Sequence, residues 1–260
     1  MQAASDVARV GGLRVVLVPT MGYLHAGHES LIRRASREGD VVVVSLFVNP
    51  TQFGPNEDYS TYPRDFDRDC ERIAASGGHM VFAPAVDEIY PDGFSTRVEV
   101  DGLTERLCGA SRPGHFGGVA TVVAKLFGAV KPHAAVFGQK DAQQVLVIRR
   151  LTRDLNLDVE VLVSPTIREP DGLARSSRNV YLSDAERRRA PVLYSTLQEG
   201  EHLIRMGIRD RGQVLDRMTS LLTKIPDTVI DYVEAVDAES LKPESCLGSV
   251  TLLALAVKFG

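Results

Sequence analysis

Five short apolar runs, separated by more polar stretches, divide the first two thirds of the chain. They cover residues 14–18, 40–48, 80–82, 134–137 and 158–163. Continuous runs rich in Val and Leu are typical of strands buried on both faces of a parallel sheet. Apolar residues at helical spacing follow the first run, with Leu31, Ile32 and Ala35 ahead of a helix end at Gly39. This alternation predicts an α/β fold with a doubly wound parallel sheet.

Further helices are expected over residues 63–75, from His115 onward and after Asp141, each placed between two predicted strands. Residues 96–100 instead alternate between polar and apolar side chains. That alternation favours an edge strand or a hairpin arm, a suitable place for pairing with a second subunit.

The composition changes after residue 165. Residues 183–206 predict one long polar helix with Ser183 as its N-cap, and residues 213–222 predict another helix. Strand-like runs follow at 229–233 and 252–257. We therefore expect two domains, a larger one over residues 1–165 and a smaller α+β C-terminal lid domain over residues 166–260.

Composition and charge exclude several classes of protein. The 260 residues are 44% hydrophobic and 25% charged, as in ordinary globular proteins, and the net charge of -4 offers no basic surface for nucleic acid. No apolar run approaches the roughly 18 residues of a membrane span, and the first residues lack a signal-peptide pattern. Cys70, Cys108 and Cys246 are odd in number and far apart, which favours a reducing compartment. We expect a cytoplasmic protein without membrane or nucleic-acid partners.

The turn after the first predicted strand contains the most specific chemistry. Gly22 and Gly27 allow the backbone to approach a ligand closely, and the N-terminus of the following helix favours an anion. His25 and His28 add two imidazoles that can donate to phosphate oxygens. A purely structural turn and a metal-binding histidine pair are the alternatives, although no Cys, Asp or Glu completes a zinc-like set nearby. The turn predicts a nucleotide site.

Three later segments contain polar side chains at positions suited to ligands. Gln52 stands in a polar loop after the second strand, where a solvated side chain is the alternative. Arg112 and His115 could bind an anion or simply cap a helix. The turn after the fourth strand repeats the opening geometry with Gly138-Gln139-Lys140-Asp141, and Gln144 follows on the same helix face. This turn could form the second half of a nucleotide site or an ordinary charged helix start.

The segment 165–179 is rich in groups that bind anions. It contains Arg168, Arg175, Ser176, Ser177 and Arg178. Adjacent hydroxyls and guanidinium groups can wrap a triphosphate and neutralise a departing pyrophosphate. A solvated basic loop is the alternative.

Five motifs in one order resemble the pantoate-beta-alanine ligase (pantothenate synthetase) family. They are Pro-Thr-Met-Gly-x-Leu-His-x-Gly-His, Phe-Val-Asn-Pro-x-Gln-Phe, Ser-Arg-Pro-Gly-His-Phe, Phe-Gly-Gln-Lys-Asp-x-Gln-Gln and Ser-Ser-Arg-Asn. The resemblance implies a Rossmann-like domain followed by a smaller one. It also implies a cytoplasmic homodimer that condenses pantoate with beta-alanine, using ATP and magnesium, through a pantoyl-adenylate with release of pyrophosphate and AMP.

The same resemblance implies the roles of individual residues. The catalytic set is His28, His25, Lys140, Ser176, Ser177 and Arg178, with His28 as the usual proton donor. The ATP-binding set is Met21, Gly22, Tyr23, Leu24, His25, Ala26, Gly27, His28, Gly138, Gln139, Lys140, Asp141, Ile167, Arg175, Ser176, Ser177 and Arg178. Gln52 and Gln144 bind pantoate, no residue is a dedicated metal ligand because ATP carries the magnesium, and Asn49, Tyr62 and Arg112 match positions around the pocket.

Position 175 departs from the family pattern, because Arg stands where Met or Leu is usual, so charge replaces an apolar contact near the nucleotide. The chain also begins with little of the family's usual N-terminal segment, and it ends earlier than the family usually does. Two alternatives to the ligase stay open. One is another adenylate- or cytidylate-forming transferase of the same fold, which would lack the Gln52 and Gln144 pair. The other is a non-catalytic paralogue that binds ATP without turnover.

Overall fold

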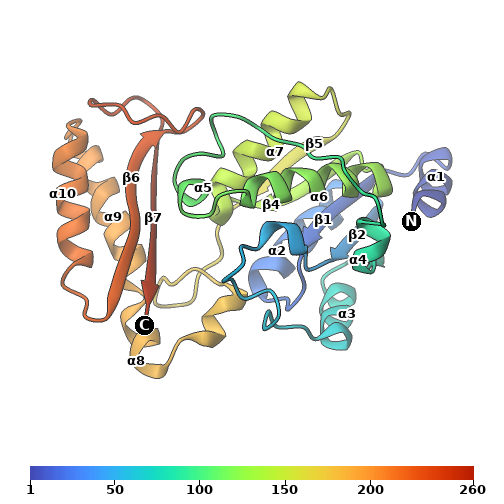
Figure 1. Ribbon diagram of the computed structural model, residues 1–260, viewed down its shortest axis with the longest axis horizontal. Coiled ribbons are helices and arrows are strands. Elements are labelled where there is room, and N and C mark those ends of the chain that lie inside the picture. The colour runs from blue at the N-terminus through green and yellow to red at the C-terminus, as the bar shows by residue number, and fades with distance from the viewer. The chain divides into compact units, whose positions relative to one another are not determined.

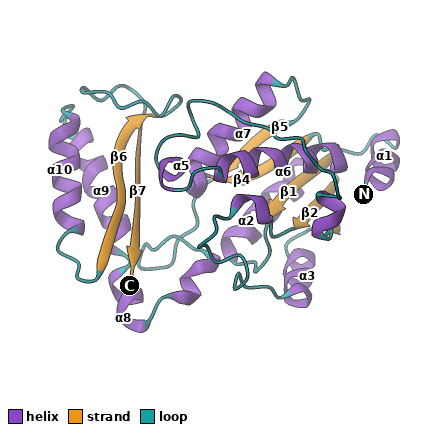
Figure 2. Cartoon of the chain, in the orientation of Figure 1, coloured by secondary structure: helices purple, strands orange, loops and turns teal.

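A computed structural model describes residues 1–260, which divide into two compact units. The first unit comprises Met1–Thr104 and Arg112–Ile167, and the second comprises Glu105–Ser111 and Arg168–Gly260. Figures 1 and 2 show the helices and strands of each unit. Each unit is described by itself below.

The first unit is built on a five-stranded parallel sheet of order β3-β2-β1-β4-β5. Its strands are β1 (Val15–Thr20), β2 (Val41–Leu46), β3 (Met80–Phe82), β4 (Ala134–Gly138) and β5 (Glu160–Ser164). The register is direct, with Val16 of β1 opposite Val42 of β2. All five predicted strands are therefore confirmed, as is the α/β class with a parallel sheet.

Helices connect these strands. They are α1 (Gln2–Val10), α2 (Ala26–Glu38), α3 (Phe66–Ala75), α4 (Val86–Ile89), α6 (His115–Val130) and α7 (Ala142–Asp154), with short 3₁₀ turns η1 (Pro50–Gln52) and η2 (Gln139–Asp141). Val16 and Val18 of β1 pack against Ile32 of α2 and Ile73 of α3 in one fully apolar cluster. The intervening Leu17 points to the other face of the sheet, because successive strand residues alternate. Burying each of these side chains contributes roughly 1.5–3 kcal/mol to folding.

The strand order reverses between β1 and β4. The chain passes from β1 outward to β2 and β3, and then returns to place β4 on the other side of β1. Ligands of open α/β sheets bind at such a switch point, outside the carboxyl ends of the strands. The residues that follow β1 and β4 are therefore the first place to look for a site.

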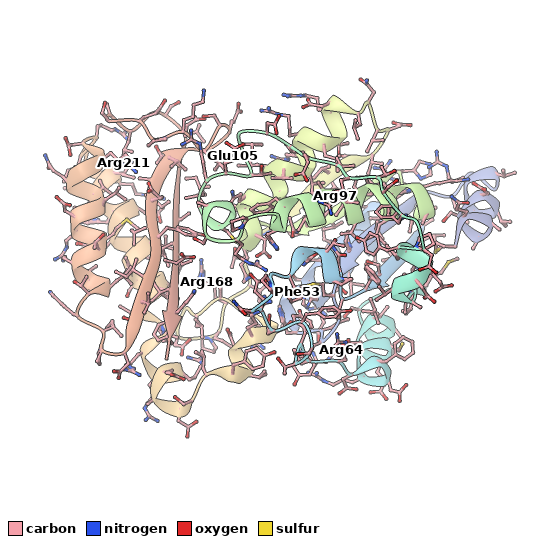
Figure 3. The ribbon with its side chains drawn as sticks, viewed as in Figure 1. Phe53, Arg64, Arg97, Glu105, Arg168 and Arg211 are labelled. Carbon is pink, nitrogen blue, oxygen red and sulfur yellow. The ribbon has the colours of Figure 1, made fainter.

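The second unit contains an antiparallel pair, β6 (Thr228–Asp237) and β7 (Thr251–Phe259), as predicted from the two apolar runs. Its helices are α5 (Cys108–Ser111), α8 (Asp184–Arg189), α9 (Val192–Arg205) and α10 (Arg211–Leu222), with a 3₁₀ turn η3 at Ser177–Tyr181. Val214 and Met218 of α10 pack with Ala235 of β6 in the core of this unit. Figure 3 labels Arg211 at the start of α10, where its Nε donates to the carbonyl of Ala235 at 2.9 Å.

Three predicted elements are wrong in detail. The single helix expected over 183–206 is two helices, because Pro191 supplies no N–H and a new helix starts after it. Residues 96–100 form no strand, although Val100 is buried, and the N–H of Val98 donates to the side chain of Thr121 rather than to a neighbouring strand. The helix expected from residue 63 begins at Phe66, because Asp65 caps it.

The structure also bears on two other predictions, the absence of a membrane span and the state of the cysteines. No helix combines the length and apolar character that a membrane crossing requires. All three cysteines are free, and Cys246 is exposed.

Candidate active site

His25 and His28 form the N-terminal cap of α2. The Nδ1 atom of His25 accepts from the N–H of Gly27 at 3.1 Å, and Nδ1 of His28 accepts from the N–H of His25 at 3.4 Å. The two rings stack with their centroids 4.1 Å apart. Because both Nδ1 atoms accept, these bonds assign the proton of each neutral ring to Nε2. The start of α2 thus combines two imidazole donors with the positive end of the helix dipole.

The backbone just before this cap is unusual. Gly22 and Tyr23 both have positive φ, 84° and 50°. The N–H groups of Tyr23 and Leu24 each donate to the carboxylate of Asp69 on α3, both at 2.7 Å. The N–H of Gly22 donates to the hydroxyl of Thr20 at 3.2 Å. This turn is therefore held from both the end of β1 and the start of α3.

Lys140 and Asp141 lie close to His28 across the switch point. Their side chains form an ion pair of 3.1 Å after β4, and both charges act on His28. Burial lowers the pKa of His28 to about 3, with further lowering by His25 and Lys140. Desolvation acts to raise the pKa of Asp141, but the charge and hydrogen bond of Lys140, together with His28 and His115, outweigh it and the pKa is lowered. At neutral pH the site combines a neutral His28 with a charged Lys140 and Asp141.

The loop after β2 places Gln52 beside the first turn. Its Nε2 atom lies 3.0 Å from the sulfur of Met21, and its Oε1 accepts from Nδ2 of Asn49 at 3.2 Å. Asn49 is 1% exposed and also donates to the carbonyl of Gly118 at 3.1 Å, while its Oδ1 accepts from the Tyr90 hydroxyl at 2.8 Å. These bonds fix the Gln52 amide with its donor end toward Met21.

Arg112 and His115 hold the same loop at its backbone. Nδ1 of His115 lies 2.8 Å from the carbonyl oxygen of Gln52, and Arg112 donates to that oxygen at 3.2 Å. Arg112 also forms a two-point ion pair with Glu57, at 2.7 and 2.5 Å, and this hydrogen-bonded pair lowers the pKa of Glu57. The predicted anion ligand Arg112 therefore has a carboxylate partner within the protein.

An aromatic cluster follows Gln52. The ring of Phe53 meets those of Tyr59 and Tyr62 edge-on, at centroid distances of 5.4 and 5.9 Å. Arg64 covers Tyr59 at 5.7 Å, and Figure 3 labels both Phe53 and Arg64. These ring contacts pack the side chains of the loop against one another, so Gln52 lies at the start of an ordered segment.

The other predicted residues of the first unit have simpler surroundings. Gly138 ends β4, and a Cβ there would meet nothing within 4 Å. Gln144 is half-buried on α7 and Ile167 is half-buried after β5, whereas the side chain of Leu24 is fully buried in the core. Leu24 can therefore offer only its backbone to a ligand. Ala26 and Gly27 form the first turn of α2, and Gln139 begins η2.

Arg175, Ser176, Ser177 and Arg178 belong to the second unit. Arg175 pairs with Glu169 at 2.8 Å across a short turn that is closed by an Arg168–Ala174 bridge. The hydroxyl of Ser176 accepts from the N–H of Arg178 at 3.3 Å and caps η3. Arg168, labelled in Figure 3, stacks over Tyr194 at 3.9 Å. The arginine that departs from the resembled pattern thus has a local carboxylate partner.

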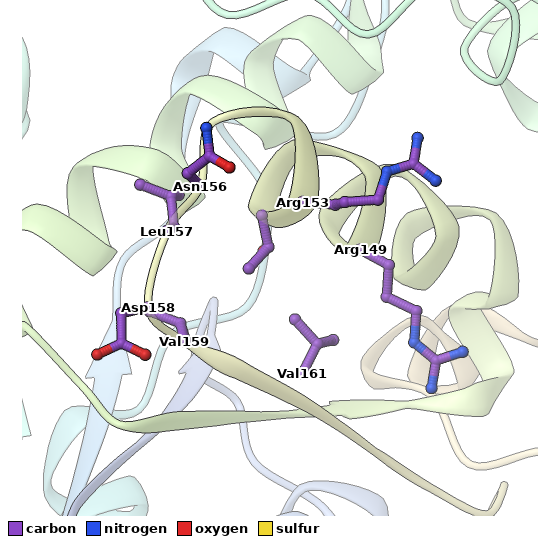
Figure 4. Close-up of a pocket in the computed structure, with 8 residues that line it drawn as sticks. Arg149, Arg153, Asn156, Leu157, Asp158, Val159 and Val161 are labelled. Carbon is purple, nitrogen blue, oxygen red and sulfur yellow. The ribbon is translucent and has the colours of Figure 1, made fainter.

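Two hollows lie in the first unit. One of about 270 Å³ is lined partly by Met21, Gly22, Phe47 and Asp69, beside the first turn. The other, of about 550 Å³, lies where α7 ends and β5 begins, at the amino end of that strand, whereas the histidines follow the carboxyl end of β1. Figure 4 shows Arg149 and Arg153 on one side of it and Asp158 on the other. No group of three or more His, Cys, Asp or Glu side chains is arranged to hold a metal ion.

The sequence patterns missed one contributor to this site and did not predict the contact that a second one makes. Asp69 was part of a predicted amphipathic helix without a role, yet it is 2% exposed and binds the turn 45 residues earlier. His115 is predicted as an anion ligand or a helix cap, and the structure adds its contact with the backbone of Gln52. Both contacts join segments far apart in the chain, so local spacing gave no signal for them.

Comparisons with known proteins agree along the whole chain. The family model described as pantoate-beta-alanine ligase matches residues 1–260. A pantothenate synthetase of Moorella thermoacetica is 56% identical over 253 residues, covering 97% of this chain and 89% of the relative. A crystal structure of pantothenate synthetase from Thermus thermophilus has a TM-score of 0.92 at 50% identity, covering 95% and 89% of the two chains. The Francisella tularensis ligase, complexed with beta-gamma ATP and beta-alanine, has a TM-score of 0.76 at 34% identity, covering 97% and 93%.

Proposed function

Since the chain belongs to the pantoate-beta-alanine ligase family and catalyses the ATP-dependent condensation of pantoate with beta-alanine, we propose that it does so through a pantoyl-adenylate. A carboxylate oxygen of pantoate attacks the α-phosphorus of ATP, and the bond to pyrophosphate breaks. The amine of beta-alanine, once it has lost a proton, then attacks the acyl carbon. The new amide bond forms as AMP departs with the bridging oxygen.

The proposed ATP site follows from the groups gathered at the switch point between β1 and β4. His25 and His28 donate to phosphate oxygens from Nε2, and Lys140 supplies positive charge as the pyrophosphate leaves. Asp141 and Gly138 face the ribose, and Ile167 faces the adenine. Because His28 is neutral at pH 7, it acts as a hydrogen-bond donor rather than as an imidazolium acid. This assignment rests on one observation. His25 and His28 each accept a backbone N–H at Nδ1, which leaves Nε2 as the donor, and His28 lies beside Lys140.

Pantoate is proposed to bind through Gln52 and Gln144. The amide of Gln52 is oriented by Asn49 so that its Nε2–H donors point toward Met21, next to the nucleotide turn. Such donors suit the carboxylate or hydroxyl groups of the acid. No protein nucleophile is needed, so catalysis rests on positioning and charge stabilisation.

The second unit supplies the remaining phosphate ligands in this proposal. Arg175, Ser176, Ser177 and Arg178 form a loop that contacts the phosphates when the C-terminal domain, residues 166–260, closes as a lid. Hydroxyl and guanidinium donors match phosphate oxygens in charge and geometry. In the structure Glu169 pairs with Arg175 and so neutralises part of the positive charge that this loop presents.

Magnesium is proposed to arrive with ATP. The residues present fit a metal held by substrate phosphates, because no cluster of acidic or imidazole side chains offers a cage. When bound, Mg²⁺ would neutralise phosphate charge. A homodimer and a cytoplasmic location are further proposals that rest on the family. Light scattering coupled to size-exclusion chromatography tests the dimer through the particle mass.

The adenylate route is tested with pantoate labelled with ¹⁸O in its carboxylate. One labelled oxygen should appear in the phosphate of AMP, and pantoate alone should support exchange of labelled pyrophosphate into ATP. Label found in inorganic phosphate instead would replace the adenylate with an acyl-phosphate.

A further inference from the structure

The first turn of α3 presents one buried carboxylate to the turn that precedes His25. Asp69 is 2% exposed, and its two oxygens accept separately from the N–H groups of Tyr23 and Leu24, both at 2.7 Å. Two short bonds to one carboxylate fix the direction of both peptide groups. The carboxylate thereby sets the path of the chain as it enters the cap of α2.

This part of the backbone needs external support. Gly22 and Tyr23 are consecutive residues with positive φ, and for Tyr23, which has a Cβ, this conformation is strained. A Cβ on Gly22 would lie 3.1 Å from Oδ2 of Asp69, so the carboxylate fits a turn that has glycine at this position. The turn and Asp69 are therefore matched in shape as well as in hydrogen bonding.

Other residues of α3 also contact the Gly22–Leu24 turn and helix α2. The guanidinium of Arg68 lies 4.9 Å from the ring centroid of Tyr23, and Arg72 forms an ion pair with Glu29 in the first turn of α2. Ile73 joins the cluster that contains Ile32 of α2. Helix α3 thus holds both the turn and the helix whose N-terminus carries the two histidines.

We propose that Asp69 is a positioning residue that holds the Gly22–Leu24 turn so that the Nε2–H groups of His25 and His28 face the phosphates of ATP. Asp69 acts through the backbone and does not itself touch the substrate. The inference rests on the proposed roles of His25 and His28. Helix α3 follows β2, whereas α2 follows β1. Through Asp69, α3 thereby takes part in nucleotide binding.

The test compares Asp69→Asn with Asp67→Asn. Asp67 lies in the same first turn of α3 but is exposed, so it controls for the loss of negative charge near the helix N-terminus. An asparagine at 69 can accept from only one of the two N–H groups and turns its own NH₂ toward the other. We expect Asp69→Asn to raise the KM for ATP and lower kcat, each by a factor of about 10 or more, with the KM for pantoate changed less than twofold. Asp67→Asn should match the wild type.

A spectroscopic measurement separates positioning from a general loss of structure. The ¹⁵N shifts of the His25 and His28 rings report which nitrogen carries the proton, and they should move in Asp69→Asn but not in Asp67→Asn. Unchanged ring shifts with an unchanged KM for ATP would overturn the proposal and leave Asp69 a purely structural group. If Asp69→Asn does not fold, Gly22→Ala disturbs the same contact from the side of the turn. It should likewise raise the KM for ATP and change the KM for pantoate less than twofold.

His28→Gln serves as the comparator for the site assignment. If His28→Gln has full activity, the proposed histidine roles fail, and the positioning role fails with them. If His28→Gln loses activity while Asp69→Asn keeps it, only the positioning role fails. The assay follows formation of AMP, so neither result depends on whether a pantoyl-adenylate forms.

Discussion

At the scale of single residues, the state of His28 is set by hydrogen bonding and electrostatics together. Its Nδ1 accepts a backbone N–H, which assigns the proton to Nε2, while burial and the neighbours His25 and Lys140 disfavour a second proton. The motif alone predicted imidazoles at a helix start. It could not predict their protonation, because Lys140 lies in η2, more than 100 residues later in the chain.

The lowered pKa of His28 makes a prediction about stability. The pKa falls from 6.5 in the unfolded chain to about 3 in the folded protein. As the pH drops below 6.5, the unfolded chain gains a proton that the folded protein does not, so the folded state loses stability. Between pH 7 and 5 this loss should be at most about 2 kcal/mol. Urea unfolding of wild type and His28→Gln at both values measures it, and an equal pH dependence in the two would contradict the assignment.

Arg175 gives a second prediction at this scale. Because Arg175 pairs with Glu169, replacing it with the Met usual in the family leaves a carboxylate without that partner. We expect Arg175→Met alone to weaken ATP binding several-fold. The double variant with Glu169→Gln should recover most of it, because the charge is then removed from both sides. Calorimetric titration with a non-hydrolysable ATP analogue measures the affinity of both variants. Tighter binding by Arg175→Met than by the wild type would show that the Arg175–Glu169 ion pair weakens ATP binding.

At the scale of elements, the patterns predicted buried strands well and their surroundings less well. All five strands of the parallel sheet are visible as apolar runs. The central strands β1, β2 and β4 are mostly buried, whereas β3 and β5 at the edges are only partly buried. Residues 96–100 show the limit of alternation: Val100 is buried as the pattern required, but no strand lies beside the segment to pair with it. The break at Pro191 had a local signal in the missing N–H, which the helical periodicity of 183–206 obscured.

Helix α6 gives the prediction that belongs to this scale. Gly118 lets the helix approach η1, because a Cβ there would collide with the carbonyl of Thr51 and lie 2.8 Å from the N atom of Gln52. Gly118→Ala should therefore displace Gln52 and raise the KM for pantoate by a factor of about 10. Gly128 on the same helix has open space at its Cβ position, so Gly128→Ala should leave KM unchanged and stabilise the helix by about 0.5–1 kcal/mol. Equal KM values in the two variants would show that this packing does not position Gln52.

At the scale of the whole molecule, the residues proposed to bind substrates are divided between two compact units. The imidazoles, Lys140 and Gln52 belong to the first, and the Ser176–Arg178 loop belongs to the second. Sequence order suggested this division through the change in composition after residue 165. It could not predict that residues 105–111 pack with the second unit, where Ser111 donates to Asp231 at 2.7 Å, because that bond spans 120 residues.

This division makes the proposed lid testable by hydrogen exchange. If the second unit closes on the phosphates, the backbone N–H groups of residues 174–181 should exchange at least several-fold more slowly when an ATP analogue and pantoate are both bound, because closure removes them from water. The α10 helix of the same unit is the internal control, since closure as a rigid body leaves its exchange unchanged. Arg178→Ala should bind the analogue yet lose the protection, because the guanidinium that joins loop to phosphate is gone. Protection that appears equally in α10 would mean that ligands stabilise the whole unit rather than close a lid, and unchanged exchange at 174–181 would remove this loop from the ATP site.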